Sequence, residues 1–283
     1  MRKFVFVLAL LAGGIFLPAS IAPALMIAPP AGPVRIVNSD AVFVGRVVEI
    51  EPIDVDARRF PGAKDTVKWR IAVVKVNDAI HGLKTEKTVR VGFIPFVAPK
   101  PGQPIVSPGG RSPQLAVGQD GLFMISKHAD AKFYQAPNYG YFVSVQDKAF
   151  NTEVKTAKKV VAIMADTTAA MKSKDADERL MAVSIAVSKY RTQKPPFPNK
   201  EELISVEESR LILDVLVKAK WGQFKFGEAN PQQLFFQLGI GAKDGFAPPK
   251  QIRTPDDMRV AVEAWGRTHG DYQIKRFVPN ADR

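Results

Sequence analysis

Ala-Val-Phe-Val-Gly-Arg-Val-Val-Glu-Ile, residues 41–50, is the stretch that decides the fold. It is rich in β-branched residues, and its apolar run passes into an alternation of apolar and polar side chains. Such a pattern predicts a strand that is partly buried on both faces. We therefore expect a β-sheet that begins near residue 41.

Four further strands are expected after this one. Residues 67–77 open with strict alternation, and residues 88–93 alternate again. Residues 95–113 contain six prolines and three glycines, which neither a sheet interior nor a helix could hold, so a long exposed loop is expected there. Residues 121–126 and 139–145 are the fourth and fifth expected strands. Five short strands with one long excursion suggest a small closed barrel.

Beyond residue 151 the apolar side chains recur about every 3.6 residues, which is the period of a helix. Capping residues and prolines then indicate where the helices begin. Helices are expected over 152–171 and from Asp175, Ser205, Asn230 and Thr254, and a last strand is expected over 272–278. A helix pair of this sort resembles HEAT-type packing, although the chain shows no repeat period that would establish a solenoid.

Three stretches carry a family resemblance: residues 39–47 (SDAVFVGRV), 69–76, and 117–125 (VGQDGLFMI). Over residues 39–146 the chain resembles the OB-fold barrels of the netrin-like and tissue-inhibitor-of-metalloproteinase group. In that group a strand with Val-Gly-x-Val is followed by a late Val-Gly-x-x-x-Leu strand. Animal members use an N-terminal cysteine to reach a protease's metal. This chain has no cysteine, so inhibition of that kind cannot be carried over.

The predicted fold class is α+β, with a small five-stranded OB-like β-barrel followed by a mainly α-helical region that holds the HEAT-like helix pair. The chain as a whole resembles exported bacterial proteins that combine such a barrel with a helical tail. The expected organisation is a signal peptide (1–24), a linker (25–38), an OB-like barrel domain (39–150) and a helical domain (151–283).

The N-terminus has the pattern of an export signal. Met1-Arg2-Lys3 is positively charged, residues 4–17 contain neither a charge nor a proline, and Ala22-Pro23-Ala24 offers small residues to a signal peptidase. We expect cleavage after Ala24 and a mature protein that is periplasmic, on the cell surface or secreted. The alternative is an uncleaved anchor, because no charge recurs before Arg35, although prolines interrupt this stretch.

Composition restricts the classes of partner. The absence of cysteine excludes disulfides and a lipid-modified N-terminal cysteine, so an exported protein of this kind depends on its core alone. Loss of residues 1–24 removes two basic residues and no acid, so the net charge falls from +12 to +10. The basic residues are dispersed, which favours weak polyanion or surface adhesion over dedicated nucleic-acid binding.

No motif of a catalytic, cofactor-binding or metal site is evident. None of the histidines, His81, His128 and His269, is followed three or four residues later by a histidine or carboxylate, so each is expected to be a lone surface residue. The best candidate contact surface is the proline-rich loop over 95–113, for which the alternative is a disordered segment without a function. Its candidate contact residues are Lys100, Gln103, Arg111 and Gln114.

These observations favour a non-catalytic protein-binding or structural module of the cell envelope, without a cofactor, whose partner is another envelope or extracellular protein. One alternative is a hydrolase that uses dispersed carboxylates such as Asp120, Glu201 or Asp257. The other alternative is a surface protein that binds polyanions. No segment after residue 24 is apolar enough to be expected to cross a membrane.

Overall fold

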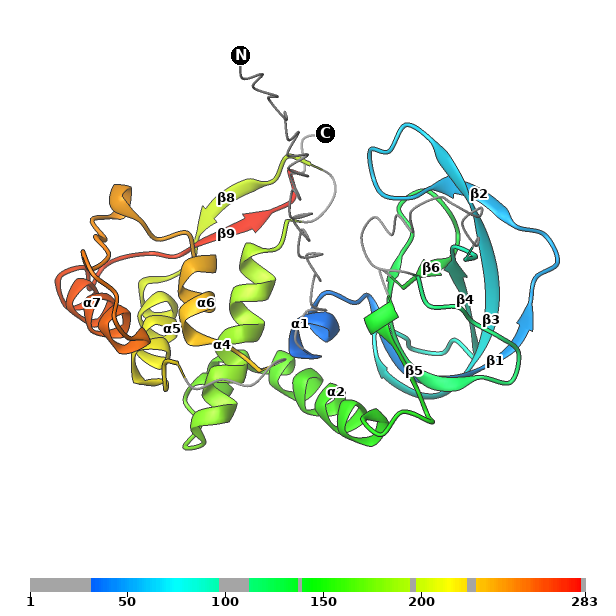
Figure 1. The fold of residues 1–283 in the computed structure, drawn as a ribbon, viewed down its shortest axis with the longest axis horizontal. Helices are drawn as coiled ribbons and strands as arrows, with labels where there is room; N and C mark the ends of the chain where they lie inside the picture. Colours follow the sequence, from blue (N-terminus) through cyan, green and yellow to red (C-terminus); the bar gives the residue numbers. More distant parts are fainter. Residues whose placement is uncertain (1–31, 97–111, 137–138, 194–196, 223–227, 281–283) are drawn as a thin grey trace, which may run out of the picture.

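The structure is a computed structural model, and it describes residues 32–96, 112–136, 139–193, 197–222 and 228–280. The α+β class expected from the sequence is confirmed. Figure 1 shows a sheet part (residues 41–144) on one side and a helical part (residues 150–280) on the other. Among the described residues, no helix has both the length and the apolar character needed to span a bilayer.

The sheet part contains a sheet of seven strands, two more than the sequence pattern predicts. They are β1 (Ala41–Ile50), β2 (Val55–Arg58), β3 (Thr66–His81), β4 (Thr88–Phe93), β5 (Asp120–Lys127), β6 (Tyr134–Gln135) and β7 (Phe142–Ser144). The pattern misses β2 and β6. The expected strand over 139–145 is the 3-10 turn η1 (Tyr139–Tyr141) followed by β7, which pairs with β5.

The strand pairings return to the strand at which they start. β1 pairs antiparallel with β3 and β5, β3 with β4, and β5 with β6, while β4 and β6 pair in parallel. The two-residue strand β6 therefore links β4 to β5. A strand this short has no alternation of side chains, which is why the sequence pattern does not reveal it.

The interior of the sheet part contains stacked aromatic rings, and glycines allow its strands to pack closely there. The Phe43 and Phe123 rings stack at 5.2 Å, and both side chains are buried. Gly45 lies opposite Gly121 across β1 and β5. A Cβ on Gly45 would lie 2.6 Å from the Lys75 carbonyl oxygen, so this position leaves no room for a side chain.

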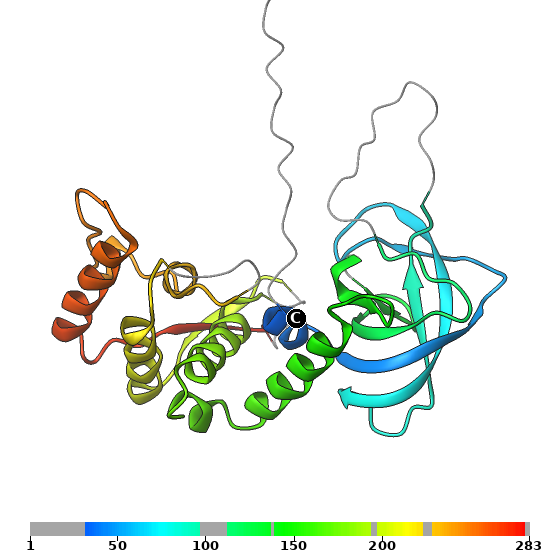
Figure 2. The ribbon, with the colours of Figure 1, turned by 60° about the horizontal axis from the view of Figure 1, so that its bottom comes forward.

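Part of the range predicted as a linker is a packed helix. Residues 32–37 form α1 (Gly32–Val37), in which Ile36 is fully buried and Arg35 is 7 % exposed. The Arg35 guanidinium donates to the carbonyl of Gly140 and, at 2.7 Å, to Glu153 Oε1. The segment lacks polar surface residues because it is covered by the protein, and Figure 2 shows it between the sheet part and the helices.

The helical part is built around one buried helix. Its helices are α2 (Phe150–Ala165), α3 (Thr167–Met171), α4 (Ala176–Arg191), α5 (Val206–Lys218), α6 (Pro231–Gln237) and α7 (Pro255–Thr268), with the 3-10 turn η2 (Ala242–Asp244). Residues 182–188 of α4 are all buried, and α4 is in contact with α1, α2, α3, α5, α6 and β9. β8 (Lys200–Leu203) pairs with β9 (Lys275–Val278) in a separate small sheet.

Side-chain caps start most of these helices where the sequence indicates. Asp175, Ser205 and Asn230 each accept backbone N–H bonds from the first turn, and Thr254 forms a full capping box with Asp257. The single helix expected over 152–171 is instead two helices. Asp166 divides them, because its side chain accepts the Ala169 N–H and starts α3 anew.

Candidate functional site

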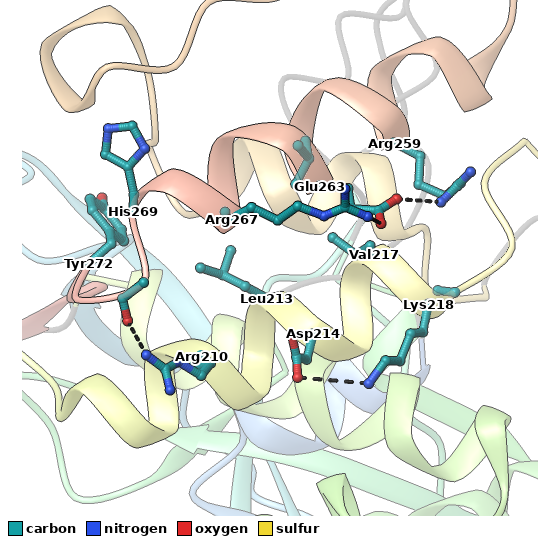
Figure 3. A pocket seen from close by; sticks show the side chains of 14 residues that line it. Arg210, Leu213, Asp214, Val217, Lys218, Arg259, Glu263, Arg267, His269 and Tyr272 are labelled. Atoms are coloured by element: carbon teal, nitrogen blue, oxygen red, sulfur yellow. Dashed lines mark hydrogen bonds and ion pairs between the residues drawn. The ribbon is translucent and has the colours of Figure 1, made fainter.

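Helices α5 and α7 lie beside each other and run in opposite directions. Arg210, in the first half of α5, donates at 2.7 Å to the carbonyl of Gly270, which follows the end of α7. The two helices are also in direct contact with each other. Their outer faces leave a groove with a volume of about 590 Å³ (Figure 3).

The floor of this α5/α7 groove is apolar. Leu213 and Val217 come from α5, and Val262 comes from α7. Leu213 and Val262 also belong to the buried core, with exposures of 8 % and 1 %, whereas Val217 is half-buried and reaches the groove surface. The groove is therefore an extension of the core that opens to solvent between two helices.

Both walls carry the same order of residue types. On α5 the order is Arg210, Leu213, Asp214, Val217 and Lys218; on α7 it is Arg259, Val262, Glu263, Gly266 and Arg267. This spacing puts all members of each set on one helix face. Because the helices are antiparallel, Arg210 and Lys218 lie toward opposite ends of the groove, whereas the Arg259 and Arg267 side chains both reach Glu263 (Figure 3).

The charged side chains on the walls form ion pairs within their own helices. Lys218 Nζ lies 3.7 Å from Asp214, and Arg259 and Arg267 both pair with Glu263. Arg259 also pairs with Asp256, and this hydrogen bond is the main cause of its raised pKa. The Arg267 and Lys218 side chains remain 76 % and 70 % exposed, so both are accessible to a partner.

At Gly266 the α7 wall of the groove has no side chain. A Cβ built on this residue would meet no atom within 4 Å, and its backbone is helical. Glycine inside a helix costs about 0.5–1 kcal/mol relative to alanine. Packing of the described residues does not account for this glycine, because alanine would fit at the same place without a clash.

One end of the groove is closed by aromatic side chains. The His269 ring stacks on Trp265 at 5.0 Å, and its Nδ1 lies 2.9 Å from the Trp265 carbonyl oxygen. Burial, and then the negative charge of Asp244, raises the pKa of Tyr272 to about 12. Tyr272 is therefore neutral near pH 7, and its hydroxyl is hydrogen-bonded to Asp244.

The contact residues expected in the proline-rich loop are only partly described. Lys100, Gln103 and Arg111 lie outside the described residues. The Gln114 side chain bonds to the protein's own backbone: its Nε2 donates to Ile94 O at 2.9 Å, and its Oε1 accepts the N–H of Phe96 at 3.0 Å. These bonds hold together the two ends of the chain that flank residues 97–111.

The carboxylates considered for hydrolysis lie on three different elements, and each has its own partners. Asp120 on β5 accepts a two-pronged bond from Arg46, which is the main cause of its lowered pKa. At Glu201 on β8, burial alone would raise the pKa, but Lys275 and Arg191 together lower it. All of these carboxylates are accordingly ionised near pH 7, which suits ion pairing rather than general acid catalysis.

Asp257, the third of these carboxylates, has a structural role at the start of α7. Its carboxylate accepts the backbone N–H groups of Thr254 and Arg253 at 2.9 and 2.8 Å. The bond from Thr254 is the largest cause of its lowered pKa, followed by the bond from Arg253. The side chain thus completes the helix cap and has little freedom for chemistry.

His128 corrects the expectation of surface histidines, because its exposure is only 7 %. Its Nε2 lies 2.8 Å from Arg58 O, and its Nδ1 accepts the N–H of Asp130. The tautomer with the proton on Nε2 satisfies both ring nitrogens, and the ring packs beside Trp69. No group of three or more potential ligands that could hold a metal ion occurs among the residues that the structure describes.

The outer surface of the sheet part carries cations that are already paired. Arg46, Arg58, Lys68, Arg70 and Arg90 each form an ion pair with an acid of the same sheet part. Several of these pairs are two-pronged, and Arg90 is held by Glu51 at 2.6 and 2.7 Å. A polyanion would have to displace these carboxylates, as an acidic ligand at Lys218 or Arg267 would have to displace Asp214 or Glu263 in the groove.

Reasoning from the sequence misses the α5/α7 groove, although a signal was present. The order Arg, apolar, acid, basic recurs at the same spacing over 210–218 and 259–267. Read alone, each stretch indicates only the solvated face of an amphipathic helix. The sequence does not show that the two faces adjoin, because that depends on how α5 and α7 pack.

No protein-family model matches the chain, and no curated protein matches it in sequence. The groove combines an apolar floor with charged rims.

Proposed function

We propose that this protein is a non-catalytic binding module that holds a segment of a partner protein in the α5/α7 groove. The observation that carries the proposal is the open groove itself, whose apolar floor is continuous with the core and whose rims carry exposed charges. An apolar centre with a polar rim is the usual arrangement of a specific protein interface.

We further propose that the sheet part is an OB-like barrel of the netrin-like type, within a barrel domain over residues 39–150. Support comes from the cycle of pairings β1–β3–β4–β6–β5–β1, since an OB barrel is a five-stranded Greek-key barrel. In this proposal β2 and β7 are additions to the cycle. The barrel and α1 act as a rigid support for the helical domain, residues 151–283, that carries the groove.

The proposed place of action is the cell envelope. Support comes from the basic start, the uninterrupted apolar stretch over residues 4–17 and the small residues at 22 and 24. A cysteine-free chain also suits an oxidising compartment, because no thiol is present to form wrong disulfides. In this proposal the partner is another envelope or extracellular protein.

Site-specific photo-crosslinking in the native envelope tests the proposed function. Benzoylphenylalanine is placed at Val217 in the groove and, as the control, at Ile53, which is 77 % exposed on the sheet part. We expect a discrete adduct at Val217 and none at Ile53. The adduct at Val217 should still form when crosslinking is carried out at about 0.5 M salt, which screens exposed charge pairs. Equal labelling at both positions, or none at Val217, would contradict a docking site in the groove.

A further inference from the structure

The shape of the groove is suited to a short helix. Arg210 and Lys218 are separated by eight residues along α5, which is about 12 Å at about 1.5 Å per residue, or slightly more than two turns. Two antiparallel helices leave a channel into which the ridge of side chains on a third helix can pack. The half-buried Val217 provides an apolar contact on the groove floor, one residue before Lys218.

The charge of the groove selects against a basic partner. Arg210, Lys218, Arg259 and Arg267 face two acids, Asp214 and Glu263, among the lining residues. Lys218 and Arg267 are the most exposed side chains of the groove's ion pairs, with the Lys218 ammonium at one end and the Arg267 guanidinium beside Glu263. Acidic residues along a docked helix would meet these cations, with a steering effect on association.

The same pattern of charge disfavours a second copy of this chain as the occupant. In a symmetric groove-to-groove contact the middle of one groove faces the middle of the other. Asp214 would then oppose the acids of the second copy, and the cations at the ends would oppose cations. Juxtaposition of like charges makes this arrangement unfavourable.

Gly266 supplies an independent observation that points to a close-packed occupant. The space above its Cα is empty, and the helix would be more stable with alanine. Glycine is typical where another backbone or ligand must approach closely. A helix that crosses α7 at Gly266 would use this space, which the packing of the described residues does not require.

From these observations we infer that the partner segment is an amphipathic helix of two to three turns whose apolar stripe is flanked by acidic residues. The helix lies along the groove, its apolar side chains contact Val217, and its acids meet Lys218 and Arg267. This inference rests on the proposed function, and it adds the chemical class of the partner.

The test uses two stapled, fluorescently labelled helical peptides of three turns. Both have the same leucine stripe, which is flanked by glutamates in one peptide and by lysines in the other. Binding to the purified protein is measured by fluorescence anisotropy. We expect the acidic peptide to bind at least about tenfold more tightly than the basic one.

Three variants distinguish the contribution of the groove to peptide binding from the effects of net charge and of fold stability. The double variant Lys218→Glu/Arg267→Glu should weaken binding of the acidic peptide by at least about tenfold, since two favourable charge contacts become repulsive. The matched control Lys155→Glu/Lys159→Glu changes net charge equally on exposed positions of α2 and should leave binding unchanged. Gly266→Ala should raise the melting temperature by about 1–4 °C and still weaken binding about tenfold.

Three results would overturn the inference: no preference for the acidic peptide, an equal loss in the α2 control, or tighter binding by Gly266→Ala. Heparin should also be tested as a competitor of the acidic peptide. If both double variants weakened the binding of heparin and of the peptide equally, the protein would bind polyanions through net charge instead. If Val217 still gives a discrete adduct while the acidic peptide shows no preference, the proposed function stands and only the class of partner is wrong.

Discussion

Substitution of Ile36 by alanine tests whether α1 is an integral part of the fold rather than a linker. Ile36 is fully buried in α1, between α2 and α4. The change removes three carbon groups, worth about 2.4 kcal/mol at about 0.8 kcal/mol each. With the cavity that remains, the expected loss in the free energy of unfolding is about 2–5 kcal/mol.

The assay is urea unfolding, followed by far-UV circular dichroism and by tryptophan fluorescence. The three tryptophans report on both parts, since Trp69 lies in the sheet part and Trp221 and Trp265 lie in the helical part. We expect the midpoint of Ile36→Ala to shift for both probes, because most buried apolar residues of both parts form one cluster with Ile36, although Trp69 belongs to a separate small cluster with Ala57, Ile71 and Phe133. The melting temperature should fall by about 5–15 °C.

The matched control is Ile53→Ala, the same substitution at a side chain that is 77 % exposed. Its expected effect is within about 0.5 kcal/mol of zero. If Ile36→Ala were as mild as this control, α1 would contribute no packing energy, and the linker predicted from the sequence would be the better description. Different midpoints from the two probes would show that the two parts do not unfold as one unit.

Four further predictions concern other positions. Gly45→Ala should cost about 1–3 kcal/mol in urea unfolding, because its Cβ would clash with the Lys75 carbonyl. Thr254→Ala should cost about 1 kcal/mol through loss of the α7 cap. Arg46 lowers the pKa of Asp120, so the ionised Asp120 stabilises the fold fully above its ordinary pKa of 3.8. This stabilisation is lost as pH falls through the lowered pKa. Asp120→Asn should therefore remove this part of the acid sensitivity in unfolding measured as a function of pH. Absorbance titration should show a tyrosine pKa of about 12 that is absent from Tyr272→Phe. Because the pKa of Tyr272 is raised in the folded state, the stabilisation by its neutral hydroxyl is complete below pH 10 and is lost as pH rises through 12.

Local features of the fold follow from the sequence. The strand over 41–50 and the helix starts at Ser205, Asn230 and Thr254 are all confirmed. Each depends on side chains within a few residues of one another, as in an alternating pattern or a cap. The break at Asp166 is also local, but it was missed because the apolar period continues across it.

Features that depend on distant pairing could not be predicted. β6 is two residues long and exists because β4 and β5 supply its partners. Ile36 looks like part of a linker until α2 and α4 cover it. His128 follows the same logic, since its burial depends on Arg58 and Trp69 from other elements.

The sequence by itself determined the α+β class, the order of most elements, the dispersed basic charge and the absence of thiol chemistry. Only the tertiary structure decided where a partner could dock. The α5/α7 groove consists of two solvated helix faces that become one surface when the helices pack antiparallel. Packing is settled by the sum of many weak contacts between residues far apart in the chain, and no local pattern encodes that sum.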